Sequence, residues 1–202
     1  MKIGILISGR GSNMVAITKA VQSGVIPDSE VAVVISDKSE ALGLEKASVL
    51  GVEEVSITRK KRSREEHDKA IIAVLQNRDV ELVCLAGYMR LLSSDFVRAF
   101  PNRIINIHPS LLPSFKGLHA HQQAIEYGVK ISGCTVHFVD EHLDHGAIIL
   151  QKAVEVKDGD TAETLSERIL KYEHEAYVEA VRRVVSGEIE VNGRHVFCRA
   201  RQ

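Results

Sequence analysis

Short runs of aliphatic and β-branched residues alternate along this chain with segments that have helical spacing. Such alternation is typical of βαβ units, in which crossover helices join parallel strands. The expected strands cover residues 3–8, 31–36, 54–57, 82–86, 103–108, 133–139 and 148–154. The expected helices cover residues 13–23, 40–50, 64–77, 93–100, 121–127 and 161–186. The pattern predicts an α/β fold with a mainly parallel, doubly wound, Rossmann-like sheet flanked by helices.

Local signals refine two regions near the carboxyl end. The last helix is expected to begin after Gly159, with Glu163 placed for a capping interaction with Asp160. Beyond that helix, the pair Asn192-Gly193 lies between two short extended runs. It predicts a hairpin with a type I′ turn.

The composition narrows the classes of partner. The 202 residues carry a formal net charge of -1 and are 45% hydrophobic, which suits one domain and gives no general attraction to nucleic acid or an anionic membrane. Cys84, Cys134 and Cys198 lack metal-ligand spacing, and the apolar run at the amino terminus is too short for a secretion signal or a membrane span. We expect a cytoplasmic protein with no nucleic-acid or membrane partner.

Asn106 and His108 lie two residues apart at the end of the strand expected at 103–108. Side chains alternate along a strand, so both should face the same side, and Pro109 and Pro113 stop the chain from continuing a regular sheet. Open α/β sheets bind their ligands at the carboxyl ends of strands. An amide and an imidazole there suit a reaction in which an oxygen becomes negatively charged, such as acyl or formyl transfer.

A glycine-containing turn follows the first expected strand and opens the first expected helix. Backbone amides at a helix start carry partial positive charge, so a phosphate can rest on Gly11, Ser12 and Asn13. The structural alternative is an ordinary turn capped by Ser12 or Asn13. Met14 stands where the dinucleotide fingerprint beginning at Gly9 has its third glycine, which favours a single phosphate over a dinucleotide.

Asp144 lies in a polar loop, residues 140–146, between two expected strands. A carboxylate close to His108 favours the protonated imidazole, which is the form that donates a proton to an oxyanion. The alternative for this acidic stretch is a solvated turn.

Four histidines crowd the same part of the chain: His119, His121, His142 and His145. Their spacings match no common zinc motif, so we expect no metal site. His119 and His121 are interpreted as residues that hold their loop or cap the helix that follows. His137 alternates with apolar residues in a strand and is interpreted as structural or supporting rather than catalytic.

Two further stretches leave alternatives open. Residues 59–64 pack five cations into six positions before a helix, which is typical of a solvated loop or of a site for a polyanion; Arg64, at the helix start, is the member expected to be fixed. Met89, Leu91 and Leu92 follow the strand at 82–86. They are either core residues or the lining of an apolar slot for a flat heterocycle.

Several segments of the chain, in their order along the sequence, resemble the phosphoribosylglycinamide formyltransferases, which are folate-dependent enzymes of purine synthesis. The resemblance covers nearly the whole chain and rests on residues 11–13, 86–90, 106–113 and 117–121 and on the Asp144 loop. It implies a seven-stranded, mainly parallel sheet. It also implies a single formyltransferase domain, residues 1–202, with a nucleotide- or phosphate-binding half (1–100) and a catalytic and folate-binding half (101–202).

The resemblance implies transfer of the formyl group of 10-formyltetrahydrofolate to the amine of 5'-phosphoribosylglycinamide (glycinamide ribonucleotide) through a tetrahedral intermediate. It implies catalytic roles, with His108 as general acid, for Asn106, His108 and Asp144. Substrate binding is implied for Gly11, Ser12, Asn13 and Glu173. Folate binding is implied for Arg64, Met89, Arg90, Leu91, Leu92, Asn106, Asp140 and Asp144. No metal is needed because the formyl donor is already activated, and the chain is expected as a monomer or homodimer.

His145 departs from the resemblance, which implies a small residue after Asp144. Formyltetrahydrofolate hydrolase (deformylase) is the nearest alternative, but it carries a regulatory domain ahead of the shared motif, and here the first expected strand begins at Ile3. Methionyl-tRNA formyltransferase adds a carboxyl-terminal RNA-binding barrel, for which we expect no room. A non-catalytic sugar-phosphate-binding module is a further alternative, which leaves Asn106, His108 and Asp144 without a role.

Overall fold

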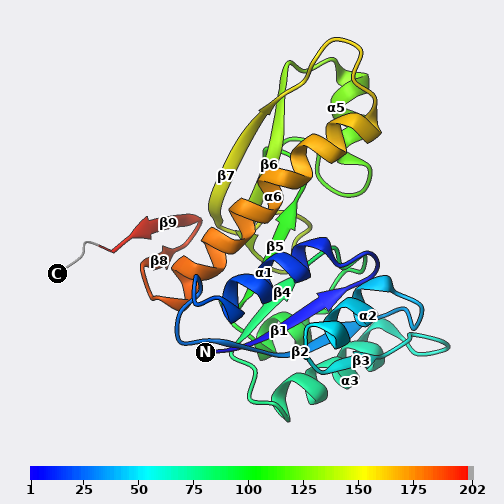
Figure 1. Ribbon diagram of the computed structural model, residues 1–202, viewed down its shortest axis with the longest axis vertical. Coiled ribbons are helices and arrows are strands. Elements are labelled where there is room, and N and C mark those ends of the chain that lie inside the picture. Colours follow the sequence, from blue (N-terminus) through cyan, green and yellow to red (C-terminus); the bar gives the residue numbers. More distant parts are fainter. Residues whose placement is uncertain (200–202) are drawn as a thin grey trace. The chain divides into compact units, whose positions relative to one another are not determined.

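A computed structural model describes residues 1–199 of the chain, with a seven-stranded sheet and a separate two-stranded sheet (Figure 1). The strands are β1 (Lys2–Ile7), β2 (Glu30–Ser36), β3 (Glu54–Ser56), β4 (Leu82–Leu85), β5 (Ile104–His108), β6 (Ile131–Phe138), β7 (Ile148–Glu155), β8 (Ile189–Asn192) and β9 (His195–Cys198). The helices are α1 (Ser12–Gln22), α2 (Leu42–Val49), α3 (Arg64–Gln76), α4 (Ser94–Ala99), α5 (Ala120–Tyr127) and α6 (Ala162–Val185).

The large sheet has the strand order β3-β2-β1-β4-β5-β6-β7. Strand β1 pairs in parallel with β2 and β4, β2 with β3, and β4 with β5, whereas β6 and β7 are antiparallel. The expected α/β class and the mainly parallel, seven-stranded sheet are therefore confirmed.

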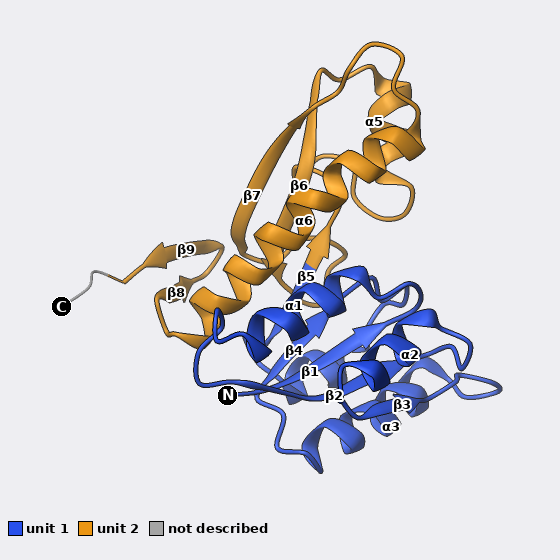
Figure 2. Cartoon of the chain, viewed as in Figure 1, with its two compact units in different colours: residues 1–106 blue, residues 107–202 orange. Residues whose placement is uncertain are grey.

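Two compact units divide the chain between Asn106 and Ile107 (Figure 2). Unit 1 contains the elements from β1 to α4 and most of β5, and unit 2 contains the end of β5 and the elements from α5 onward. The functional halves expected on either side of residue 100 stay a prediction.

In unit 1, the parallel strands are apolar on both faces because helices cover both sides of such a sheet. The side chains of Ile3, Ile5, Leu6 and Ile7 in β1 are fully buried. Helix α1 packs against α2, and α3 packs against α4. The strand order reverses between β1 and β4. Such a switch point is where open α/β sheets form a ligand crevice.

In unit 2, α6 packs along β6 and β7 (Figure 1). Its buried stripe recurs at helical spacing and consists of Leu165, Ile169, Glu173, Ala176, Tyr177, Ala180, Val181 and Val184. One member of this stripe, Glu173, is ionisable.

The expected cap of the last helix is wrong. Thr161 is the N-cap of α6, and its hydroxyl accepts from the backbone amide of Thr164 in a reciprocal capping box. Asp160 lies one residue too early to cap, and its carboxylate instead pairs with Arg168 at 2.6 Å. Glu163, at the second helical position, is not the residue that completes the box.

The expected hairpin is confirmed as β8 and β9, but the turn type is wrong. Asn192 pairs with His195, so Gly193 and Arg194 are the two central residues. Only Gly193 has a positive φ, 58°, whereas a type I′ turn needs positive values at both central positions. A glycine at the first central position is the pattern of a type II′ turn.

The cysteines of the described chain are free thiols, with Cys84 and Cys134 buried and Cys198 exposed. Among residues 1–199, none of the helices combines the length and apolar character needed to cross a membrane.

Candidate active site

The proposed phosphate loop of unit 1 is built from backbone rather than side chains. Gly11 is the N-cap of α1 with φ 69° and ψ 26°, and no side-chain hydrogen bond caps this helix. The alternative of a turn capped by Ser12 or Asn13 is therefore wrong. A Cβ atom on Gly11 would lie 2.8 Å from the Cα of Gly43, so this position requires glycine for both its left-handed conformation and its close packing.

A backbone amide and a side chain of α2 hold the loop. The Gly43 amide donates to the Gly9 carbonyl at 3.0 Å, and the Lys46 ammonium donates to the Arg10 carbonyl at 2.8 Å. These bonds fix the loop in the conformation that leaves the first amides of α1 without a side-chain cap. Uncapped amides at a helix start are suited to an anion.

The segment after β4 lies beside this loop at the switch point. The Ser8 amide donates to the Gly87 carbonyl at 3.1 Å, and the Met89 amide donates to the Ser8 hydroxyl at 2.9 Å. Met89 is 62% exposed and Leu91 56% exposed, so the core interpretation is wrong for both, and Leu92 is half-buried. Exposed apolar side chains next to a polar loop are suited to the face of a heterocycle.

The two arginines expected to bind folate have different surroundings. The Arg90 guanidinium donates to the buried Asp37 carboxylate at 2.7 Å. Arg64, the first residue of α3, is exposed and lies 3.6 Å from the Glu65 carboxylate. Because Asp37 already engages the Arg90 side chain, the Arg64 guanidinium is the freer of the two to meet a carboxylate of a ligand.

His108, at the end of β5, is buried and faces two acceptors. Its Nε2 atom lies 2.8 Å from the Phe115 carbonyl oxygen, and its Nδ1 atom lies 3.4 Å from Oδ2 of Asp144. A carbonyl can only accept, so Nε2 carries a proton. The Nδ1 atom faces the carboxylate, so both ring nitrogens of His108 lie beside groups that can accept a hydrogen bond.

Asp144 is the centre of the buried polar cluster in unit 2. Its Oδ2 atom accepts from the Gly117 amide at 2.8 Å, and its Oδ1 atom lies 3.8 Å from Nε2 of His137. The Asp144 side chain is 8% exposed. The interpretation of this residue as part of a solvated turn is therefore wrong.

Two further histidines surround this pair. His137 donates from Nδ1 to the Phe138 carbonyl at 2.7 Å, and burial lowers its pKa despite the nearby Asp144 charge. Burial also lowers the pKa of His121, and the His108 charge lowers it further. Both rings are consequently neutral near pH 7. Of His108 and His137, His108 lies nearer to the Asp144 carboxylate, at 3.4 Å against 3.8 Å.

The expected capping role of His119 and His121 is wrong for their side chains. His119 is the N-cap of α5 with φ 59°, and no side-chain hydrogen bond caps that helix. His121 instead lies within electrostatic reach of His108. Sequence reasoning did not predict that His121 is a neighbour of His108. The spacing His119-Ala120-His121 could have indicated it, because His119 is exposed whereas His121 is half-buried.

The expected roles of Glu173 and Asn106 stay predictions. Glu173 is buried in α6, and its charge adds to burial in raising the pKa of the Cys134 thiol, on β6, to about 12. Asn106 is half-buried and lies two residues before His108 in β5. Unit 2 thus brings together His108, Asp144 and two supporting histidines, with Glu173 on its long helix.

A mainly parallel α/β sheet that ends in a buried imidazole–carboxylate pair is an architecture for acyl-type transfer. The formyl transferase family matches residues 1–181, and the chain belongs to that family. Glycinamide ribonucleotide transformylase 1 from Symbiobacterium toebii, a solved structure, is 51% identical with a TM-score of 0.96, covering 98% of this chain and 93% of that one. Phosphoribosylglycinamide formyltransferase from Bacillus subtilis (strain 168) is 40% identical over 91% of this chain and 94% of its own length.

A longer relative matches as well. The trifunctional purine biosynthetic protein adenosine-3 of Gallus gallus is 47% identical over 98% of this chain. The chain spans only 20% of that relative's length.

Proposed function

We propose that this chain is a phosphoribosylglycinamide formyltransferase, which moves the formyl group of 10-formyltetrahydrofolate to the amine of glycinamide ribonucleotide in de novo purine (IMP) biosynthesis. The observation that carries the proposal is the buried contact of 3.4 Å between His108 Nδ1 and Asp144 Oδ2. The names of the relatives that match nearly the whole chain support it.

In the proposed reaction, the amine nitrogen attacks the formyl carbon, and the carbonyl electron pair moves onto oxygen. The Asn106 amide and the His108 imidazolium stabilise the resulting oxyanion. Collapse of the tetrahedral intermediate breaks the bond from carbon to N10 of the folate. The amine loses one proton and N10 gains one, and we assign this exchange to His108, Asp144 and water. General acid catalysis of this kind contributes roughly 10²- to 10⁴-fold in rate.

Two acceptors face the His108 ring and support its proposed role. A neutral ring satisfies either the Phe115 carbonyl or the Asp144 carboxylate, whereas the imidazolium donates to both. Because the Asp144 contact, at 3.4 Å, is longer than an ordinary hydrogen bond, we assign the transferable proton to Nδ1. The Phe115 carbonyl then serves to hold the ring in place.

Binding roles are proposed for the rest of the predicted residues. The amides of Gly11, Ser12 and Asn13 hold the phosphate of the ribonucleotide, and Glu173 meets its amine. The folate is proposed to contact Arg64, Met89, Arg90, Leu91, Leu92 and the backbone from Asp140 to Asp144, with Arg90 acting through its backbone because Asp37 engages its guanidinium. The partners are thus small molecules, the compartment proposed is the cytoplasm, and the chain is a monomer or homodimer.

The test is to mix the protein with 10-formyltetrahydrofolate and follow loss of the formyl group with and without glycinamide ribonucleotide. Loss that requires the ribonucleotide is the expected result. Equal loss without it identifies a hydrolase instead. No loss in either mixture, with the ribonucleotide still bound, identifies a sugar-phosphate-binding module.

A further inference from the structure

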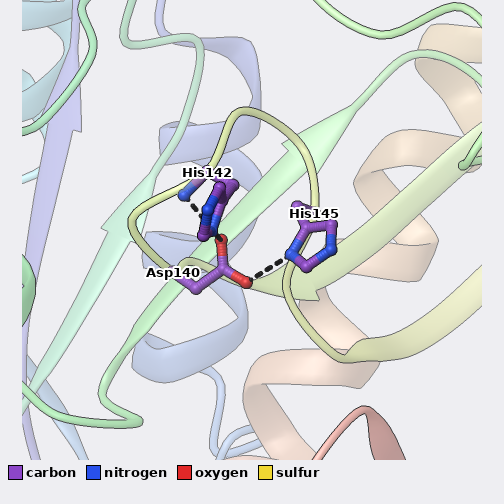
Figure 3. Close-up of side chains that lie close together, drawn as sticks. All are labelled: Asp140, His142 and His145. Carbon is purple, nitrogen blue, oxygen red and sulfur yellow. Dashed lines mark hydrogen bonds and ion pairs between the residues drawn. The ribbon is translucent and has the colours of Figure 1, made fainter.

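Three potential metal ligands converge in the turn between β6 and β7 (Figure 3). They are Asp140, His142 and His145, and one donor atom from each lies within 4.8 Å of the others. Nδ1 of His145 lies 2.8 Å from Oδ2 of Asp140, and Nδ1 of His142 lies 3.9 Å from Oδ1 of the same carboxylate. The two imidazole centroids are 5.1 Å apart.

The carboxylate of this cluster is oriented by hydrogen bonds. Its Oδ1 atom accepts from the His142 amide at 2.9 Å, and its Oδ2 atom lies 2.8 Å from Nδ1 of His145. The cluster also opens to solution, since the His142 side chain is 76% exposed, so an ion from solvent can reach it.

We propose that Asp140, His142 and His145 bind a divalent first-row transition metal of the Zn²⁺ class. Two imidazoles and one carboxylate are a ligand set that Zn²⁺ accepts, with water completing a four-coordinate site. The proposed metal site adjoins the backbone assigned to the folate, but it uses other side chains than the Asp144 carboxylate, which is directed to His108 and Gly117.

Sequence reasoning predicted no metal site because the spacing of these residues matches no common zinc motif. The conformation of the turn brings these residues together despite their unusual spacing. The bond from the His142 amide to Asp140 bends the backbone back on itself, so ligands two and five residues after Asp140 meet one carboxylate.

Arg194, in the turn of the β8–β9 hairpin, competes with the metal. Its guanidinium donates to Nε2 of His145, while Nδ1 of that ring donates to Asp140. A metal on Nδ1 requires the lone pair of that nitrogen, so the ring proton shifts to Nε2. The protonated Nε2 can no longer accept from Arg194. Removing this side chain is therefore expected to strengthen metal binding.

The experiment is a calorimetric titration of the full-length chain, freed of any affinity tag, with Zn²⁺ alone. A parallel titration with Co²⁺ reports the ligand geometry through its visible absorption. We expect one site, weakened roughly tenfold or more in His142→Ala and in His145→Ala, and tightened in Arg194→Ala. Circular dichroism of each variant checks that the fold is retained.

His195→Ala is the matched control. His195 is an exposed histidine on β9, the strand that also carries the exposed Cys198, and this variant is expected to keep the site. Three outcomes overturn the proposal. The unmodified chain binds no Zn²⁺, the His142→Ala and His145→Ala variants bind Zn²⁺ as tightly as the unmodified chain, or Zn²⁺ binding is lost only in His195→Ala. Because the titration contains no folate or ribonucleotide, its outcome is independent of the proposed enzymatic function.

Discussion

The two units build their candidate sites in different ways. In unit 1, the proposed phosphate loop is a short continuous segment, residues 8–13, whose geometry comes from one strand end, one left-handed glycine and one helix start. In unit 2, the cluster is assembled from side chains that are far apart in sequence: His108 and Asp144 are separated by 36 positions, and Gly117 lies between them. A local site depends on backbone conformation, whereas a dispersed site depends on the fold of the whole unit.

The units also differ in what their buried groups do. The loop of unit 1 offers peptide amides, which keep the same charge at every pH. The cluster of unit 2 contains buried imidazoles and carboxylates, and burial lowers the pKa values of His121 and His137. Changes in unit 2 are therefore expected to alter chemistry and pH dependence, and changes in unit 1 to alter ligand affinity.

The largest effect is expected from His108→Ala. The substitution removes the proposed general acid, so kcat/KM for formyl transfer should fall by roughly 10² to 10⁴. It also leaves the Phe115 carbonyl and the Asp144 carboxylate without this donor, at a cost of about 1–3 kcal/mol in the free energy of unfolding. Steady-state kinetics and a thermal melt measure the two effects separately.

His195→Ala serves as the control, because it deletes an exposed imidazole of the same unit. It is expected to retain the kcat/KM of the unmodified chain. A His108→Ala protein that is folded and still transfers formyl groups at the normal rate contradicts the role given to unit 2.

A smaller and different effect is expected from Gly11→Ala in unit 1. Alanine must adopt φ near 69°, and its Cβ would lie 2.8 Å from the Cα of Gly43. The left-handed conformation alone costs roughly 1–2 kcal/mol, and the loop must shift to relieve the contact. We expect a lower melting temperature and a raised KM for the ribonucleotide, with kcat changed less than in His108→Ala.

Gly24→Ala separates strain from site geometry. Gly24 also has a positive φ, 76°, but a Cβ there meets nothing within 4 Å. It is expected to lower the melting temperature without raising KM. Equal rises of KM in both variants contradict the assignment of the phosphate to the Gly11 loop.

Sequence reasoning predicted the strands and helices of both units, but only some of the side-chain contacts. Apolar runs and helical spacing located the strands and helices, because those signals are local. The pairing of Arg90 with Asp37 carries no such signal, because the two residues are 53 positions apart. A spacing rule likewise could not predict the turn that gathers Asp140, His142 and His145, because that turn includes a hydrogen bond from the His142 amide to the Asp140 side chain.

The smallest expected effect concerns the pH dependence of unit 2. Burial lowers the pKa of His121 below its ordinary value of 6.5, so the unfolded chain binds the proton more readily than the folded one. Stability contributed by the neutral ring is fully present above about pH 6.5 and is lost as the pH falls below it, with a slope of at most about 1.4 kcal/mol per pH unit. Urea midpoints at pH 7.5 and 5.5 should therefore differ less in His121→Gln than in the unmodified chain.

The same urea midpoints distinguish the contribution of His121 from that of the other histidines in the cluster. His137, whose pKa is also lowered by burial, still titrates in His121→Gln, so part of the pH dependence should survive. An unchanged slope in His121→Gln contradicts a buried, neutral His121. It would mean that the His121 ring is exposed to solvent in the folded chain. The contrast between a pH-independent loop in unit 1 and a titrating cluster in unit 2 would then depend on His137 alone.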